Sequence, residues 1–217
     1  MVPIVSIVGL SGSGKTTLME KVVSILAKKG YRVGTVKHDA HYFEIDYEGK
    51  DSWRHRKAGA STVALSSPDK FAVIKEVRKE WTPERIINSF INDVDIVITE
   101  GYKAGKFKKI EVVRKVVSGK PVNSPKTGLI ALVTDIKTIK TALPVFDIND
   151  AGGVARFIEE RIIKPHRPGT VALTVDGKPA KLSAAAQEMI MKEVAGMARG
   201  VKGAAKAKEI ELRIRKR

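Results

Sequence analysis

The feature that most constrains this chain is a glycine-rich segment near its N-terminus, residues 9–16, with the sequence GLSGSGKT. It matches the pattern G-x-x-x-x-G-K-[ST] at every fixed position. A short β-branched run at 2–8 precedes it, and apolar residues at helical spacing follow from Thr16 onward. Only glycine lets several backbone amides turn toward one point without a Cβ in the way. The segment therefore predicts a phosphate-binding loop between a buried strand and a helix.

The residue types of this loop predict how it would hold a nucleoside triphosphate. The Lys15 ammonium is expected to neutralise the β- and γ-phosphates, and the Thr16 hydroxyl is expected to ligate Mg²⁺. The N-terminus of the helix adds roughly half a positive charge directed at the same point. The expected nucleotide-binding residues of the loop are Gly9, Ser11, Gly12, Ser13, Gly14, Lys15, Thr16 and Thr17.

Strand-like and helix-like segments alternate through residues 1–164. This alternation is typical of an α/β domain, and here it predicts a three-layer P-loop NTPase domain with a mostly parallel sheet. We expect the first two strands to pair in parallel around the helix between them. The segment 42–49 could be a β-hairpin or an irregular loop. Strands are predicted at 2–8, 31–36, 62–65, 71–74, 95–99, 110–113 and 129–133, and helices at 16–29, 51–58, 83–91 and 151–163.

A second part of the site is predicted where strand 95–99 ends, at Glu100. Open α/β sheets bind ligands at the carboxyl ends of their strands, where an acid can hold Mg²⁺ or polarise the attacking water. Lys15 and Glu100 are therefore the expected catalytic residues. Lys37, at the end of the second strand, is expected beside the nucleotide, with Arg54 as an alternative. The expected metal ligands are Thr16, Asp51 and Glu100, with Asp39 as an alternative to Asp51.

Three of the four histidines fall within residues 38–55, mixed with acidic residues. A transition-metal site would need His38 and His41 to share a face, and their spacing allows this only on a helix. Because Lys37 is expected to end a strand, the segment is better interpreted as lining the phosphates.

Several short blocks of this sequence are recognisable together. They are Lys37-His38-Asp39, residues 43–46 (FEID) running into 49–52 (GKDS), residues 58–60 (AGA), and residues 100–103 (EGYK). With the glycine-rich loop, they resemble the MobB-type molybdopterin-guanine dinucleotide biosynthesis adaptor proteins over about residues 3–163. The resemblance implies a GTP-binding protein with weak GTPase activity and Mg²⁺ as cofactor, usually a homodimer. It also implies that molybdopterin, or a separate nucleotidyltransferase that joins GMP to the pterin, is a partner.

Selection of guanine requires acceptors for the base N1–H and N2–H₂. Small GTPases provide them with an aspartate that follows a strand, and Asp135 follows the predicted strand 129–133 in this way. The complete Asn-Lys-x-Asp pattern is absent here, so the preference for guanine over adenine depends mainly on the resemblance. Asp135 is nevertheless the candidate residue for binding the base.

Residues 165–217 are predicted to form a small separate module. The boundary falls in the proline- and glycine-rich segment 164–169, which divides the chain into a nucleotide-binding domain, 1–164, and a basic C-terminal module. Of the net charge of +16, +9 belongs to the first part and +7 to the second. A hairpin around Asp176-Gly177, a helix capped by Ser183 and an alternating strand at 210–215 predict a ββαβ module.

Two other functions would use the same loop. A P-loop kinase of a small metabolite needs Lys15 and Thr16 but also an acceptor pocket. A nucleic-acid-binding NTPase would fit the basic module, but residues 165–217 contain no Phe, Trp or Tyr on which bases could stack, so nucleic acid is not the expected partner. The chain has no cysteine and no apolar run of about 18 residues. We therefore expect a cytoplasmic protein without a membrane partner.

Overall fold

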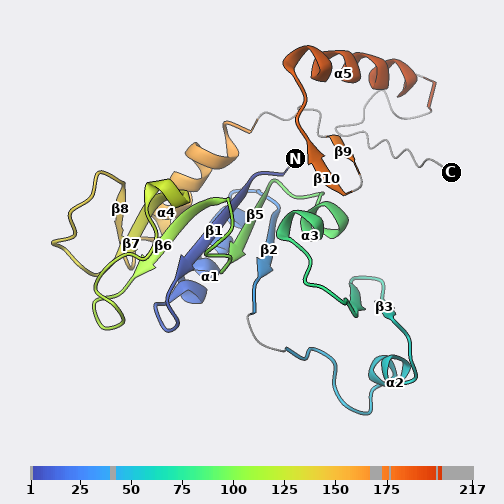
Figure 1. Ribbon diagram of the computed structural model, residues 1–217, viewed down its shortest axis with the longest axis horizontal. Coiled ribbons are helices and arrows are strands. Elements are labelled where there is room, and N and C mark those ends of the chain that lie inside the picture. Colours follow the sequence, from blue (N-terminus) through green and yellow to red (C-terminus); the bar gives the residue numbers. More distant parts are fainter. Residues whose placement is uncertain (1, 40–42, 167–172, 176, 199, 202–217) are drawn as a thin grey trace.

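The computed structural model describes residues 2–39, 43–166, 173–175, 177–198 and 200–201 (Figure 1). Its centre is a six-stranded sheet in the order β2-β5-β1-β6-β7-β8, and every neighbouring pair is parallel. The predicted α/β domain with a mostly parallel sheet is therefore confirmed. The strands are β1 Ile4–Gly9, β2 Val33–Lys37, β5 Ile96–Glu100, β6 Lys108–Val113, β7 Leu129–Thr134 and β8 Val145–Asp147.

The expected direct pairing of the first two strands was wrong. Strands β1 and β2 are parallel, but β5 lies between them and forms hydrogen bonds with both. The crossover through helix α1, Lys15–Lys28, therefore passes over one strand position before the chain returns to the sheet. This arrangement places the end of β5, with Glu100, directly beside the end of β1, where the glycine-rich loop begins.

Helices cover both faces of the sheet. On one face, α1 and α4, Ala151–Ile158, pack with β1, β5, β6 and β7 into the largest buried apolar cluster. On the other face, α3, Pro83–Phe90, covers β2 and β5. The central strand β1 is buried along nearly its whole length, as its β-branched run predicts for a strand covered on both sides.

Residues 43–78, here named the arm, leave the end of β2 and lie apart from the sheet (Figure 1). The arm contains α2, Asp51–Lys57, and an antiparallel hairpin of β3, Thr62–Ser66, with β4, Phe71–Lys75. These two predicted strands form a separate two-stranded sheet and do not join the parallel one. Residues 43–50 form an irregular loop and not the β-hairpin that the sequence also allowed for residues 42–49.

The first part of the C-terminal module has the predicted elements. Strands β9, Leu173–Val175, and β10, Lys178–Ala180, form an antiparallel hairpin. The Ser183 hydroxyl accepts a hydrogen bond from the Ala186 amide at the start of α5, Ala184–Ala198. The strand predicted at 210–215 lies outside the described residues. Among the residues that are described, no helix is long and apolar enough to cross a membrane.

Candidate functional site

The glycine-rich loop, predicted to bind phosphate, lies between β1 and α1, as its position in the sequence predicts. Gly9 has φ +147°, and a Cβ there would lie 2.5 Å from the Val112 carbonyl oxygen, so this position tolerates only glycine. Gly14 caps α1 in a left-handed conformation with φ +89°. The first turn of α1 contains no acidic residue, and no side chain caps it. Its free amides and the helix dipole therefore favour an anion.

Lys15 is the first residue of α1, and its side chain folds back over the loop. Its Nζ atom donates a hydrogen bond of 2.8 Å to the Leu10 carbonyl oxygen. Partial burial lowers the pKa of Lys15, and the nearby cations Lys103 and Lys37 act in the same direction, whereas Glu100 opposes them. An ammonium held in this way among like charges is electrostatically suited to an incoming polyphosphate.

The Thr16 hydroxyl reaches the second predicted element of the site. It donates a hydrogen bond of 2.9 Å to Glu100 Oε1, although the two residues are 84 positions apart in sequence. Just beneath them, the buried hydroxyls of Ser6 and Thr99 are 2.7 Å apart and join β1 to β5. The structure thus brings together Thr16 and Glu100, two of the three predicted metal ligands.

The end of β2 completes this side of the site. Lys37 pairs with Glu100 in the sheet register, so its backbone lies beside the strand end that carries the carboxylate. The His38 amide donates to the Glu100 carbonyl oxygen at 2.9 Å. The His38 ring contacts Tyr102 and lies 3.0 Å from a Glu80 carboxylate oxygen. His41 is outside the described residues.

The third predicted metal ligand lies elsewhere in this structure. Asp51 begins α2 in the arm, apart from α1 and the loop (Figure 1), and its side chain is 88% exposed beside Arg54. In the part of the chain that the structure describes, no group of three or more histidine, aspartate or glutamate side chains could hold a metal ion. The assignment of Asp51 to Mg²⁺ therefore stays a prediction.

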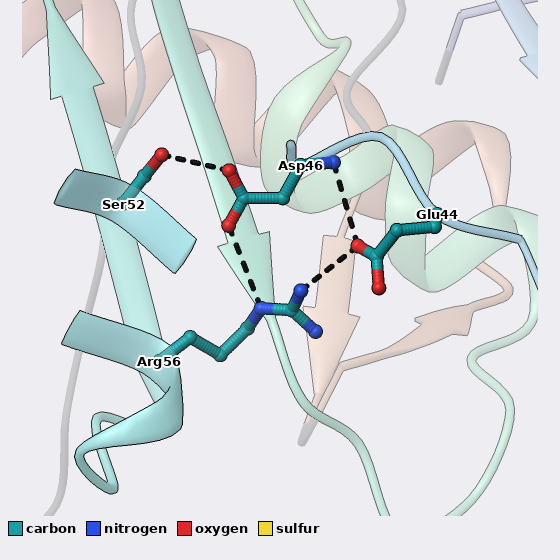
Figure 2. Close-up of polar contacts among 4 residues, drawn as sticks. All are labelled: Glu44, Asp46, Ser52 and Arg56. Atoms are coloured by element: carbon teal, nitrogen blue, oxygen red, sulfur yellow. Dashed lines mark hydrogen bonds and ion pairs between the residues drawn. The ribbon is translucent and has the colours of Figure 1, made fainter. Parts of the chain in front are cut away.

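The neighbouring acidic residues of the arm hold its irregular loop on α2 (Figure 2). The buried carboxylate of Asp46 accepts a 2.7 Å hydrogen bond from the Ser52 hydroxyl and lies 3.6 Å from Arg56 Nε. Arg56 Nη2 donates to Glu44 Oε1 at 2.9 Å. Ser52 and Arg56 both belong to α2. This part of the recognisable FEID and GKDS blocks thus has a structural role in the arm.

On the other side of the loop, Asp135 directly follows β7, as predicted. Its two carboxylate oxygens accept hydrogen bonds of 2.8 Å each, from Arg114 Nε and from the Lys115 amide. The Lys115 hydrogen bond is the largest cause of a lowered pKa for Asp135, and Arg114 contributes in the same direction. Asp135 is therefore an ionised acceptor at neutral pH.

The sequence reasoning missed two features of this site. One is the hydroxyl pair of Ser6 and Thr99. These residues lie within the mostly apolar strands β1 and β5, and the apolar pattern predicts burial but not their hydrogen bond. The other is Arg114, which directly follows β6 at the same edge of the sheet. The signal for Arg114 was present, because it is a charged residue after a buried strand, as Glu100 and Asp135 are.

A family model described as molybdopterin guanine dinucleotide synthesis protein B, MobB, matches residues 4–135. The chain belongs to the MobB family. A molybdopterin-guanine dinucleotide biosynthesis adapter protein of Haemophilus influenzae is 35% identical over 159 residues, covering 73% of this chain and 88% of that protein. The Escherichia coli protein of the same description is 31% identical over 167 residues, covering 74% and 93%.

Solved MobB structures agree with this assignment. A crystal structure of molybdopterin-guanine biosynthesis protein B has a TM-score of 0.58 and 33% identity, covering 73% of this chain and 99% of that one. Bacillus subtilis MobB has a TM-score of 0.59 and 28% identity, covering 74% and 98%. The matched MobB segment includes Lys15, Thr16, Glu100, Arg114 and Asp135, and it excludes the C-terminal module.

Proposed function

We propose that this chain is a GTP-binding accessory protein with weak GTPase activity. In this proposal it is a cytoplasmic adaptor that assists a separate nucleotidyltransferase in attaching GMP to molybdopterin. Membership of the MobB family and the adapter descriptions of its relatives support the pathway. The observation that carries the nucleotide-binding part is the hydrogen bond between Thr16 and Glu100 beside the glycine-rich loop.

The residues at this point fit a magnesium ion. A hydroxyl oxygen and a carboxylate oxygen are 2.9 Å apart at the N-terminus of α1, and both are the hard ligands that Mg²⁺ prefers. Thr16 and Glu100 would hold the ion, directly or through water. When bound, Mg²⁺ would neutralise charge on the β- and γ-phosphates.

Each residue of the site has a distinct task in this proposal. The amides of residues 12–16 would bind phosphate oxygens, and Lys15 would leave the Leu10 carbonyl oxygen to pair with the β- and γ-phosphates. Glu100 would orient the attacking water at the γ-phosphate. Lys37, beside Glu100 in the sheet, would add positive charge on the γ-phosphate side.

Calorimetric titration of the full chain with GTP, ATP and GDP, with and without Mg²⁺, tests this proposal. We expect GTP to bind more tightly with Mg²⁺, and Lys15→Ala to weaken binding more than about tenfold, because charge-assisted hydrogen bonds are lost. Lys21→Ala, an exposed lysine on the same helix, is the matched control. Absence of triphosphate binding, or equal affinity for Lys15→Ala, would contradict the nucleotide assignment.

The adaptor role needs its own measurement. GMP attachment to molybdopterin by the purified nucleotidyltransferase should be faster when the full chain and GTP are present than without the chain. The Lys15→Ala variant should not give this increase. Equal rates with and without the chain would reject the adaptor role while leaving nucleotide binding intact.

The proposed homodimer is supported by apolar side chains that the arm exposes. Ile45, Tyr47 and Phe71, all in the arm, are 65%, 79% and 68% exposed, which is a high exposure for apolar side chains of this size. A second copy of the chain would cover them. Light scattering of the full chain should give the mass of two chains, and Phe71→Ser combined with Ile45→Ser should shift that mass toward one.

A further inference from the structure

The Thr16–Glu100 contact indicates which way the proposed nucleotide lies along the edge of the sheet. This inference rests on the proposed nucleotide-binding function. On the β5 side of the loop lie the groups suited to the metal and the γ-phosphate. A triphosphate whose terminal end lies there must extend its nucleoside the other way along the edge of the sheet. The next strands in that direction are β6 and β7, which end at Val113 and Thr134.

Arg114 stands at this second side of the loop. Its Nη1 atom lies 3.8 Å from the position that a Cβ on Gly14 would occupy, so the guanidinium borders the residue that caps α1. Its side chain is 35% exposed. Among the described residues, its only hydrogen-bonded side-chain partner is Asp135, through Nε. Arg114 thus links the phosphate loop, which follows β1, to the Asp135 carboxylate, which follows β7, two strands away in the sheet.

The backbone around Arg114 is fixed independently of any ligand. Its carbonyl oxygen accepts hydrogen bonds from the amides of Val117, Ser118 and Gly119, which closes a tight turn after β6. Further along, the buried carboxylate of Glu111 accepts bonds of 2.7 and 2.9 Å from the amides of Val122 and Asn123. The loop that carries Arg114 is therefore held at both ends.

Asp135 is held by two donors but is not saturated. Each of its oxygens accepts one hydrogen bond of 2.8 Å, and a carboxylate offers about four acceptor positions in all. Its side chain is 26% exposed, so the remaining acceptor positions are open to a ligand. Its lowered pKa keeps it ionised, and it accepts hydrogen bonds without donating any.

We propose that Arg114 is a positioning residue for base selection: it fixes the Asp135 carboxylate beside the phosphate loop so that guanine is bound in preference to adenine. Guanine presents two donors on one edge, N1–H and N2–H₂, which match the two remaining acceptor positions of a fixed carboxylate. Adenine presents the N1 lone pair at the corresponding position, which an ionised carboxylate repels. A carboxylate free to rotate would discriminate less.

The test compares GTP with ATP in the full chain. We expect Arg114→Gln to lower GTP affinity by about tenfold or more and to change ATP affinity less than about twofold, because the phosphate contacts remain. Arg114→Lys should recover part of the preference, since it keeps the cation but loses the fixed planar donors. Arg161→Gln changes an exposed arginine in the helical segment Glu159–Ile163, which follows α4, and is the matched control.

Other outcomes would overturn the inference. An equal loss for GTP and ATP would make Arg114 a support of the phosphate loop, and no change for either would give it no role. Equal binding of GTP and ATP by the unaltered chain would remove the selectivity to be explained. Failure of the unaltered chain to bind any triphosphate would instead refute the proposed nucleotide site itself.

Asp135→Asn provides a second measurement that does not depend on the folding of the Arg114 variants. An asparagine amide donates to the C2 oxygen of xanthine where aspartate accepts from the C2 amino group of guanine. We expect this variant to lose GTP affinity about tenfold or more and to bind xanthosine triphosphate more tightly than GTP. If the order of affinities stays GTP over xanthosine triphosphate, Asp135 does not contact the base and the inference is wrong.

Discussion

The Thr16 hydroxyl and the Glu100 carboxylate meet at 2.9 Å, joining the first turn of α1 to the end of β5. The contact depends on the strand order, because β5 is inserted beside β1. It also depends on Gly9, where a Cβ would collide with the neighbouring strand and prevent the loop from turning here. One acidic side chain thereby lies against Thr16, the residue that is proposed to bind Mg²⁺.

From this contact we predict that Glu100→Gln lowers both the rate of GTP hydrolysis and the affinity for GTP. The fold-decrease in the rate should be at least about ten times the fold-decrease in the affinity. The amide keeps the size of the side chain and can still pair with Thr16, but it cannot orient water as a carboxylate does. Single-turnover hydrolysis beside calorimetric binding measures both quantities. Equal hydrolysis rates for the variant and the unaltered chain would remove Glu100 from the catalytic residues.

The environment of Lys15 predicts a pH dependence of binding. Its pKa is lowered from the ordinary 10.5 in the free protein by burial, and a bound triphosphate would raise it again. Binding should therefore take up part of a proton at alkaline pH, and GTP affinity should fall as pH rises through the lowered pKa. Calorimetry in buffers of different ionisation heat measures the uptake. Lys15→Arg should bind without that uptake, because its guanidinium stays charged.

The buried hydroxyl pair beneath the site predicts a non-additive effect on stability. Thr99→Val leaves the Ser6 hydroxyl buried without its 2.7 Å partner and should cost about 1–3 kcal/mol in the free energy of unfolding. The double variant Ser6→Ala/Thr99→Val removes both polar groups and should be closer to the unaltered chain than Thr99→Val is. Urea unfolding measures the three values, and simple additivity would contradict this account.

The sequence predicted most elements because their local signals agree with the fold. The β-branched run before Gly9 forms the central strand. The helix predicted at 83–91 is α3, which begins at Pro83 after Thr82, whose side chain accepts a hydrogen bond from the Arg85 amide. The insertion of β5 between β1 and β2 is a long-range choice that no local pattern specifies. The short strand β8 was missed because three residues give too little periodicity.

The site was predictable to the extent that its residues occur in a contiguous motif or at a strand end. Lys15, Thr16 and Glu100 are predicted in this way, and the structure brings them together. Asp51 is predicted near the metal because it lies between Thr16 and Glu100 in the sequence, whereas the structure places it at the start of α2 in the arm. Arg114 borders Gly14 and donates to Asp135 across many sequence positions, and its place after a strand did not single it out.

The last prediction concerns the boundary near Lys164. Deleting residues 165–217 should leave GTP affinity within about twofold and change association with the nucleotidyltransferase or the pterin. Every candidate site residue precedes Lys164. The buried residues of the two apolar clusters on the faces of the sheet, and of a smaller third cluster of Val113, Leu129 and Leu132, all lie between Val5 and Ile163. A module whose described residues contribute nothing to those clusters should be removable without unfolding the sheet. Circular dichroism checks the fold, and titration of the truncated chain at low and high salt checks binding. Folded protein that binds GTP about tenfold more weakly, with increased salt sensitivity, would show that the basic module takes part in the nucleotide site.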